Sequence, residues 1–467
     1  MTALDTWFIH VEDDINHMHI GSIGVFEGPP PPLSRLQRAI EVSLDHIPRY
    51  RQRYREVARG LARPIWVDDP RFRLDYHVRH TALPWPGDHE QLCRLIGRIM
   101  SQPLDRQRPL WETWFVEGLT DDRWAMINKV HHCIVDGIAG TDLLAIILQT
   151  DPESLPPDAD ADGTDADDAE PDGSGRDGSE PGLLTAIRGL AAGSGEVVRT
   201  ATSALRHPVA TASRGLGTLR GASELVDVLQ PMPPSSLTGP IGPHRRYGTA
   251  HGDLADAKAV KQALGGTVND VVLAAITAGY RDLLAHRGEL SAHSVVRTMV
   301  PISLRREDER GELHNLVSAM FVALPVAADE PAERYRVVRD AMAEMKRSGE
   351  HHATAGIVAA SGLAPNMFVG LALRTVTQLL QRHQRFITTV TTNVPGPQQP
   401  LYLVGRRLLH AYPYVPVAEG LRTGVAIFSY DGQLAFGVTA DADEVEDLEV
   451  LTAGIEHGMD ELVALVR

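Results

Sequence analysis

Cysteine is scarce in this chain, and the scarcity excludes one class of protein. Among 467 residues there are only 2 cysteines, Cys93 and Cys133, so at most one disulfide bond can form. A small fold held together by several disulfides is therefore excluded. Such sparse cysteine is typical of proteins that work in a reducing compartment, and we expect a cytoplasmic location.

An excess of basic residues is also absent. The 45 Lys and Arg residues face 61 Asp and Glu residues, which gives a formal net charge of −16. Because nucleic-acid phosphates are held by Lys and Arg, no nucleic acid is expected as a partner. Most of the acidity belongs to one segment, since residues 151–180 hold 12 acidic residues and one Arg.

Signals for export or for a membrane span are lacking as well. The opening residues, MTALDTWFIHVEDD, contain no basic stretch followed by an apolar core. The longest uncharged stretch, residues 353–373, has the length of a membrane span, but Ser361, Gly362, Pro365 and Asn366 interrupt it. We therefore expect a buried or interfacial helix there, broken before Pro365.

What the chain does contain is an ordinary globular composition, with 43% hydrophobic residues. At roughly 100–200 residues per domain, its length predicts two to four domains or lobes. We divide it into a mixed N-terminal region at residues 1–150, an acidic linker at 151–182, a helical bridge at 183–239 and a second mixed region at 240–467. The linker is too poor in apolar residues to fold by itself. The basic stretch 183–229 within the bridge either packs on the body or lies on a lipid surface.

Periodicity predicts helices and strands in both mixed regions. Strands are expected over residues 18–26, 124–130, 295–301 and 318–326, helices over 33–47, 91–100, 138–148 and 268–284, and a hairpin over 421–430 and 433–438 with its turn at Asp431-Gly432. Both halves therefore mix helices and strands, which gives the fold class α/β (α+β).

The sharpest chemical signal is the segment HHCIVDG at residues 131–137. His131 and His132 stand at the end of a strand-like run, and Asp136 and Gly137 follow within a tight turn. Histidine titrates near neutral pH and can accept a proton from a hydroxyl. A nearby carboxylate and a glycine turn can orient such a base, so the segment predicts a site of general acid–base chemistry.

Other interpretations of the two histidines have less support. A metal site is not expected, because adjacent His side chains on extended backbone point apart and neither an HExxH motif nor a cysteine pair accompanies them. Two purely structural histidines would leave the following Asp-Gly unexplained. Cys133 as a nucleophile would need a base that approaches it suitably, so we expect a filler residue instead. The second pair, His351-His352, has no following Asp-Gly and is expected to face solvent.

Signatures of several other enzyme classes are missing. The chain contains no G-x-S-x-G nucleophile elbow, no Walker A sequence and no G-x-G-x-x-G fingerprint. A serine hydrolase, a P-loop NTPase and a dinucleotide-dependent enzyme therefore all lose support.

HHCIVDG resembles the HHxxxDG motif of the coenzyme-A-dependent acyltransferase superfamily, which includes chloramphenicol acetyltransferases, peptide-synthetase condensation domains and wax ester synthases. Further segments resemble the bacterial wax ester synthase/diacylglycerol acyltransferase family, in particular its actinobacterial triacylglycerol synthases: LDTWFIHVEDDINHMHIG (4–21), PLDRQRPLWE (103–112), NDVVLA (269–274), TNVPGP (392–397) and SYDGQLAFG (429–437). They follow one another in order, and the acidic linker alone falls outside the resemblance. Thr392 stands where the family usually has Ser.

The resemblance implies two chloramphenicol-acetyltransferase-like lobes joined by a helical bridge, with an active-site channel between them. It implies transfer of a long-chain acyl group from acyl-CoA to diacylglycerol, and many members also esterify long-chain alcohols. Acyl-CoA is then a substrate, and no cofactor is expected. Because the substrates are apolar, we expect peripheral attachment to a membrane or lipid droplet, through residues 353–373 or the basic stretch 183–229.

The resemblance also implies roles for the residues of the motif. His132 would be the general base, and His131 would support the geometry of the loop. Asp136 would hold the loop through a buried ion pair, for which Arg305 is our candidate partner. Gly137 would permit the turn and the close approach of substrate.

Two further groups of residues have two readings each, and a third segment has one. The family pattern places Asn269 and Asp270 near the channel as substrate-binding or oxyanion residues, where Asn269 would donate a hydrogen bond to the developing oxyanion; the alternative is that the two residues only cap a helix. Pro109, Leu110 and Trp111 serve lobe packing or the channel wall rather than chemistry. Residues 392–397 are expected to form a rigid loop, because two prolines restrict the backbone and a glycine allows a turn.

Two alternative functions remain open. The first is a condensation-type acyltransferase that uses carrier-bound acyl groups, although the chain contains no carrier domain. The second is a non-catalytic, lipid-binding member of the family, against which the intact His131, His132 and Asp136 argue.

Overall fold

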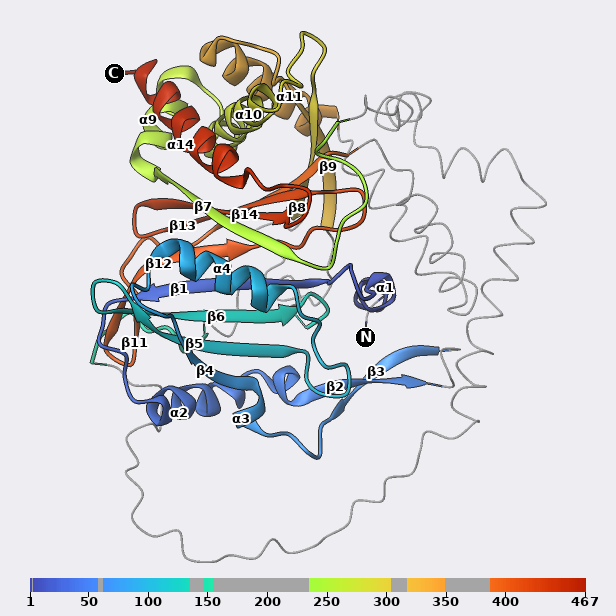
Figure 1. The fold of residues 1–467 in the computed structure, drawn as a ribbon, viewed down its shortest axis with the longest axis vertical. Coiled ribbons are helices and arrows are strands. Elements are labelled where there is room, and N and C mark those ends of the chain that lie inside the picture. Colours follow the sequence, from blue (N-terminus) through green and yellow to red (C-terminus); the bar gives the residue numbers. More distant parts are fainter. Residues whose placement is uncertain (2, 58–61, 135–145, 154–234, 304–316, 349–386) are drawn as a thin grey trace, which may run out of the picture.

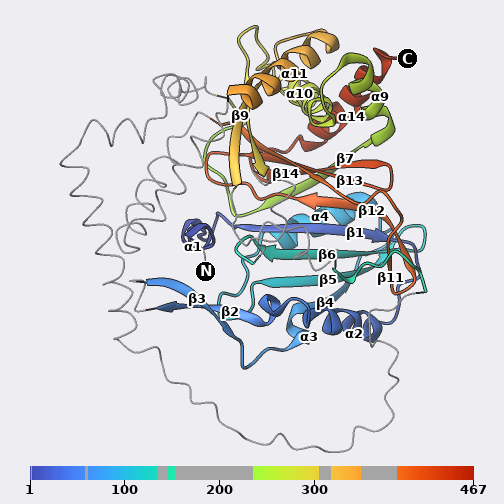
Figure 2. The ribbon, with the colours of Figure 1, turned by 180° about the vertical axis from the view of Figure 1, so that it is seen from behind.

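Two six-stranded sheets, stacked one above the other, organise the chain (Figure 1). They are seen in a computed structural model that describes residues 1, 3–57, 62–134, 146–153, 235–303, 317–348 and 387–467. A separate hairpin pairs β2 (Gln52–Val57) with β3 (Ala62–Asp68). Helix α1 (Ala3–Val11) lies beside the end of the first sheet, as both Figure 1 and Figure 2 show.

The first sheet has the strand order β11-β12-β1-β6-β5-β4. Its strands are β1 (His19–Phe26), β4 (Val78–Ala82), β5 (Trp111–Leu119), β6 (Arg123–His131), β11 (Tyr402–Leu403) and β12 (Arg406–Tyr414). Helices α2 (Leu33–Leu44) and α3 (Leu74–His77), with the short helix η1 (Pro48–Arg51), lie below it in Figure 1. The apolar face of α2 and large aromatic residues of β5 and β6, including Phe115 and Trp124, share one core.

The second sheet has the order β7-β14-β13-β10-β8-β9. Its strands are β7 (Arg245–Asp253), β8 (Val296–Ser303), β9 (Val317–Leu324), β10 (Thr389–Pro395), β13 (Thr423–Tyr430) and β14 (Gln433–Asp441). Helices α9 (Leu254–Leu264), α10 (Val268–His286), α11 (Pro331–Ser348) and α14 (Leu448–Ala464) cover its outer face (Figure 2). The buried residues of α10 and α14 pack on this sheet in a core of their own.

One strand ties the two halves together. Strand β12 comes late in the chain yet pairs antiparallel with β1 of the first sheet, with Val25 opposite His410. The sheets also approach closely where β12 passes β14: a Cβ atom on Gly437 would lie 1.8 Å from the Pro413 carbonyl oxygen, so only glycine fits. The predicted division of the chain at residues 150 and 240 stays a prediction. The two sheets do not coincide with it, because β12 comes from the C-terminal region but belongs to the first sheet.

Helix α4 (His89–Met100) is packed between the two sheets (Figure 1). Its apolar side chains, Leu92, Leu95, Ile96 and Ile99, share a core with residues of the first sheet and with Tyr247 and Ala435 of the second. A Cβ atom on Gly97 would lie 2.5 Å from the Arg245 carbonyl oxygen, so this glycine lets α4 touch β7 directly. The contact between the halves is therefore an apolar core, which favours a fixed arrangement.

The predicted strands β1, β6, β8 and β9 and the predicted helices α2, α4 and α10 are confirmed within a few residues. The hairpin turn is confirmed too, because Asp431 and Gly432 have φ angles of 44° and 81°, as a tight hairpin requires. The expectation of a loop over residues 392–397 is partly wrong. Strand β10 continues to Pro395, since it pairs in parallel with β13 through that residue.

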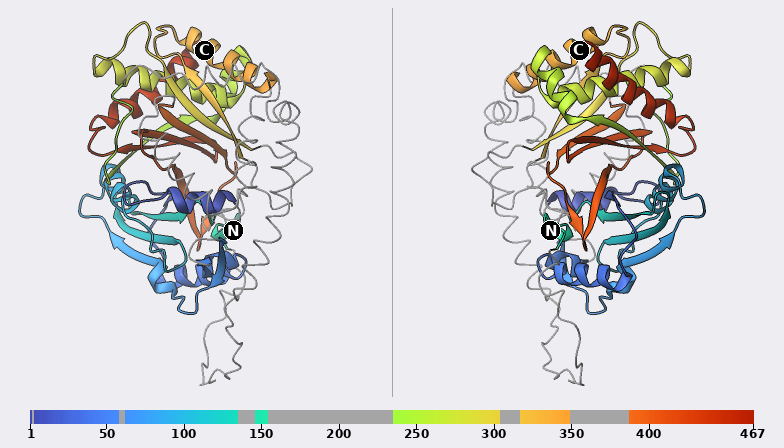
Figure 3. Two further views of the ribbon diagram at one scale, coloured as in Figure 1. Left: turned by 90° about the vertical axis from the view of Figure 1, so that its right-hand side faces the viewer. Right: turned by 90° about the vertical axis from the view of Figure 1, so that its left-hand side faces the viewer.

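Several expectations fall on residues that the structure does not describe. These are most of the helix expected over 138–148, the acidic linker from residue 154 on, the basic bridge stretch 183–229, residues 353–373 and the pair His351-His352. Among the described residues, no helix combines the length and apolarity that a membrane crossing needs. The C-terminus lies in the outer helix layer and the N-terminus beside the first sheet (Figure 3).

Candidate active site

His131 is the last residue of β6, and its side chain is fully buried. Its Nδ1 atom accepts a hydrogen bond from the backbone N–H of Cys133 at 3.2 Å. Its Nε2 atom lies 3.6 Å from Oε2 of Glu12. Because both ring nitrogens face protein groups, His131 is placed to hold the turn rather than to meet a substrate.

Glu12 directly follows α1, and its side chain is 4% exposed. Its Oε2 atom lies 2.9 Å from Nη2 of Arg106, and its Oε1 atom accepts a hydrogen bond from the backbone N–H of Met18 at 3.2 Å. Burial acts to raise the pKa of Glu12, but the hydrogen bonds and charges of His131 and Arg106 outweigh it and bring the pKa down to about 2. Glu12 is therefore a buried anion held between a guanidinium group and an imidazole.

His132 begins the turn after β6, where its backbone N–H donates to the Met18 carbonyl oxygen at 2.8 Å. Its ring stacks on Phe8 of α1, with 4.1 Å between the ring centroids and 20° between the planes. The residue is partly exposed, whereas its Nδ1 atom is buried and has no hydrogen-bond partner among the described residues. Because Nδ1 is enclosed, we expect Nε2 to be the ring nitrogen that meets an incoming group.

The surroundings of His132 keep its ring neutral. The pKa of this imidazole is lowered to about 4, chiefly by burial and also by the neighbouring His131, against the opposing effects of a backbone hydrogen bond and of Asp5. At neutral pH the ring therefore carries no proton on one nitrogen, which is the form that a general base requires.

Cys133 lies between the histidines and the rest of the motif, but its thiol is buried. Its Sγ atom is 2.9 Å from Nδ1 of His131. Burial raises the pKa of the Cys133 thiol well above its usual range, and the charges of Asp5 and Glu12 raise it further. Since the thiolate is the reactive form, this environment favours the filler role over the nucleophile role.

Pro109, Leu110 and Trp111 lead into β5 beside the histidine turn. The Leu110 carbonyl oxygen accepts the backbone N–H of His131 at 2.9 Å. The indole N–H of Trp111 donates to the Tyr50 carbonyl oxygen at 2.8 Å. The side chains of Leu110 and Trp111 are buried, so the contacts of this segment are those of structural support.

Asn269 and Asp270 lie at the start of α10, in the other half of the molecule. The Asp270 side chain completes a capping box with Thr267, accepting the Thr267 backbone N–H at 2.7 Å. Asn269 Oδ1 accepts a hydrogen bond from the Asn393 side chain of β10 at 3.3 Å. Within the described parts of the chain, neither residue forms a hydrogen bond or an ion pair with His131 or His132.

The remaining predicted residues cannot be placed beside the histidines. Asp136, Gly137 and Arg305 lie outside the described residues, so the expected ion pair between Asp136 and Arg305 stays a prediction. In the described ranges, no group of three or more His, Cys, Asp or Glu residues is arranged to hold a metal ion.

Sequence reasoning missed three residues of this site, namely Glu12, Phe8 and Arg106. All three belong to segments that carry the family resemblance, Glu12 and Phe8 to residues 4–21 and Arg106 to residues 103–112. The structure brings both segments onto the histidine turn. The sequence offered one clue to them: residues 4–21, 103–112 and 131–137 all carry the family resemblance, so their side chains could be expected to meet at one site.

Comparison with known proteins agrees with this assembly of motifs. Residues 1–272 match the wax ester synthase/diacylglycerol acyltransferase catalytic domain, and residues 313–463 match the C-terminal domain of the same family. A probable diacylglycerol O-acyltransferase of Mycobacterium tuberculosis is 38% identical over 472 residues, which covers 100% of this chain and 96% of the relative. A putative diacylglycerol O-acyltransferase of the same species is 33% identical over 467 residues, covering 100% of this chain and 91% of the relative.

Solved structures show the same fold. The wax ester synthase/diacylglycerol acyltransferase from Marinobacter aquaeolei VT8 superimposes with a TM-score of 0.69 at 26% identity, covering 100% of both chains. The first condensation domain of the calcium-dependent antibiotic synthetase superimposes with a TM-score of 0.58 at 15% identity, covering 100% of this chain and 95% of that one. The second likeness is one of fold alone.

Proposed function

The chain belongs to the wax ester synthase/diacylglycerol acyltransferase family, and on that premise we propose that this acyltransferase moves a long-chain acyl group from coenzyme A to the hydroxyl group of diacylglycerol. The observation that carries the proposal is the pair of histidines at the end of β6, His131 buried against Glu12 and His132 partly exposed. The names of the full-length relatives support diacylglycerol as the acceptor. The Marinobacter protein is named a wax ester synthase as well as a diacylglycerol acyltransferase, which supports a long-chain alcohol as a second acceptor.

His132 is the general base of the proposed reaction. The acceptor O–H bond breaks as its proton passes to Nε2 of His132, and the acceptor oxygen bonds to the thioester carbon. The C–S bond then breaks, and the thiolate of coenzyme A takes the proton back from the imidazolium ring. Because the acyl group passes directly to the acceptor, no covalent acyl-enzyme forms and Cys133 plays no chemical part.

The residues around His132 orient it. Phe8 stacks on its ring, and the backbone of the same turn is held by His131, which faces Glu12. Asp136 and Gly137 would complete the turn, with Arg305 pairing Asp136, as the family motif implies. Asn269 remains our candidate donor to the oxyanion: its Oδ1 atom accepts a hydrogen bond from Asn393, and its Nδ2 group is the donor end of the amide.

We place the enzyme in the cytoplasm, attached peripherally to a membrane or lipid droplet. The reason is chemical: diacylglycerol and its ester product partition into lipid, so the enzyme must meet a lipid surface. Flotation of the purified chain with phosphatidylcholine vesicles, with and without diacylglycerol, tests the attachment. Recovery of all the protein in the unbound fraction in both cases would contradict it.

The substrate class is tested with the purified full chain and palmitoyl-CoA, offered dioleoylglycerol, hexadecanol or no acceptor. We expect acceptor-dependent release of free coenzyme A, with triacylglycerol as the product of the first reaction and a wax ester as that of the second. Turnover of an acyl-carrier thioester but not of palmitoyl-CoA would favour the condensation-type alternative. Diacylglycerol binding without any ester product would favour a non-catalytic, lipid-binding protein.

A further inference from the structure

The turn between α1 and β1, residues 13–17, is held rigidly by its own hydrogen bonds. The Asp13 side chain accepts the backbone N–H groups of Ile15 and Asn16 at 2.9 and 2.7 Å. The Asp13 backbone N–H donates to the Asn16 carbonyl oxygen at 3.1 Å. The turn therefore moves as a unit, and Glu12 immediately before it moves with it.

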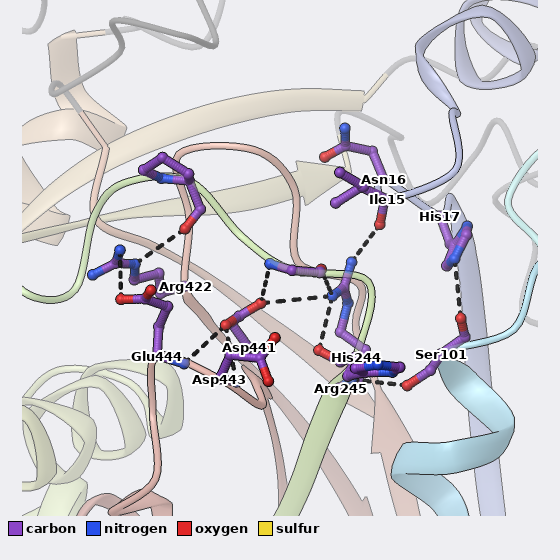
Figure 4. Close-up of polar contacts among 12 residues, drawn as sticks. Ile15, Asn16, His17, Ser101, His244, Arg245, Arg422, Asp441, Asp443 and Glu444 are labelled. Carbon is purple, nitrogen blue, oxygen red and sulfur yellow. Dashed lines mark hydrogen bonds and ion pairs between the residues drawn. The ribbon is translucent and has the colours of Figure 1, made fainter.

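Arg245, the first residue of β7, clamps this turn from the other half of the molecule (Figure 4). Its Nη2 atom donates to the Ile15 carbonyl oxygen at 2.5 Å, and its Nη1 atom donates to the carbonyl oxygens of Gly242 and His244 at 2.6 and 3.0 Å. The guanidinium group is almost fully buried, and its nearest carboxylate oxygen, on Asp441, is 3.9 Å away. A buried guanidinium group that donates hydrogen bonds to backbone carbonyl oxygens makes a strong and directional contact.

Ser101 links the same strand to the same turn, and Glu419 contacts the turn from another segment of the C-terminal half. The Arg245 backbone N–H donates to the Ser101 hydroxyl at 2.8 Å, and His17 Nε2 donates to the Ser101 carbonyl oxygen at 3.1 Å. The Asn16 side chain accepts the backbone N–H of Glu419 at 2.6 Å. Figure 4 shows the Ile15 carbonyl oxygen directed at Arg245 and the His17 ring directed at Ser101.

From these contacts we propose that Arg245 is a positioning residue for the acyl-transfer reaction: by clamping residues 13–17 it sets Glu12 against Nε2 of His131. The Glu12 carboxylate reaches His131 on one oxygen and the Met18 backbone N–H, just beyond the turn, on the other. Displacing the turn therefore displaces the carboxylate. This inference rests on the proposed function, since it assigns Arg245 to the same site.

Arg422 supplies a matched control. It is also an arginine of the C-terminal half, donating to the carbonyl oxygens of Ser236 and Pro240 and pairing with Glu444 at 2.7 Å. These partners lie in the same half of the molecule as Arg422 itself. Arg422→Gln therefore removes a comparable set of side-chain contacts, none of which is made with residues 12–17.

The experiment compares Arg245→Gln, Arg245→Lys and Arg422→Gln in the full chain, using palmitoyl-CoA and dioleoylglycerol. We expect Arg245→Gln to lower kcat by about 10-fold to 100-fold with little change in KM for palmitoyl-CoA, because misplacement of a catalytic group acts on the chemical step. Arg245→Lys keeps a cation near the carbonyls and should recover part of kcat. Arg422→Gln should keep kcat within about 2-fold of the unmodified protein.

Hydrogen exchange gives a readout that does not depend on activity. Amides of residues 13–18 should exchange faster in Arg245→Gln than in the unmodified protein and in Arg422→Gln. Unchanged exchange there, or equal loss of kcat in Arg245→Gln and Arg422→Gln, would overturn the proposal. If the unmodified chain shows no acyl transfer, the proposed function fails, while the exchange data still show whether Arg245 holds Glu12 in place.

Discussion

The Glu12 carboxylate lies 3.6 Å from the imidazole of His131, although one residue follows the first helix and the other ends β6. The same carboxylate is paired with Arg106, so three separate segments of the chain meet at one buried charge. This contact gives His131 a fixed partner and leaves His132 as the histidine that faces outward.

We expect Glu12→Gln to lower kcat by about 10-fold to 100-fold, because the neutral amide orients His131 less firmly. The melting temperature should fall as well, since the pKa of Glu12 is held near 2 by partners that the amide cannot satisfy equally. Glu117→Gln is the control, because its ion pair with His80 is largely exposed and contributes little. A Glu12→Gln enzyme with full kcat would show that His131 needs no partner.

Cys133→Ala should keep most of the activity. The contact that matters to His131 at this position comes from the Cys133 backbone N–H, which the substitution preserves. The thiol itself is buried and has a raised pKa, so it offers no thiolate to attack a thioester. Steady-state rates of the purified variant check this expectation. A folded but inactive Cys133→Ala would restore the nucleophile interpretation.

Acid should destabilise the fold through its buried histidines. His77 is fully buried, donates Nδ1–H to the Trp111 carbonyl oxygen at 2.8 Å, and has its pKa lowered to about 4, chiefly by burial. Between pH 6.5 and 4, His77 therefore binds a proton in the unfolded chain but not in the folded chain. The free energy of unfolding falls as the pH falls through that window. For His77 alone, the free energy of unfolding should drop by about 2 kcal/mol from pH 7 to pH 5.

Urea unfolding at pH 7 and pH 5 measures this drop. His77→Gln should be less stable at pH 7 but should lose less stability on going to pH 5, because glutamine does not titrate. If the unmodified protein and His77→Gln lose equal stability between the two pH values, His77 does not carry this part of the pH dependence.

The sequence could predict the elements that build the site, but not how they meet. Strand β6 is an apolar run that ends in two histidines, and α10 begins with an N-capping sequence, so both are visible as local patterns. The pairing of β12 with β1 is invisible locally, because it joins strands from opposite ends of the chain. The same holds for Arg245, whose carbonyl partners are backbone atoms that carry no residue signature.

The burial of Glu12 could not be predicted either. In the sequence it is the first of three consecutive acids, EDD, which suggests a solvated surface turn. In the structure Glu12 is buried because Arg106 supplies the opposite charge and the Met18 backbone N–H a further hydrogen bond, whereas the Asp13 side chain accepts hydrogen bonds within its own turn and Asp14 is exposed. Partners distant in sequence decide which acid of such a run turns inward.

The most direct test of the account is the turnover of His132→Ala beside the unmodified protein, with palmitoyl-CoA and dioleoylglycerol. His132 is partly exposed and its side chain has no hydrogen-bond partner at Nδ1 among the described residues, so the variant should melt within a few degrees of the unmodified protein. Its kcat/KM should be lower by roughly 10²–10⁴-fold, the usual effect of removing a general base. A folded His132→Ala with near-normal kcat/KM would contradict the assignment of His132 as the base.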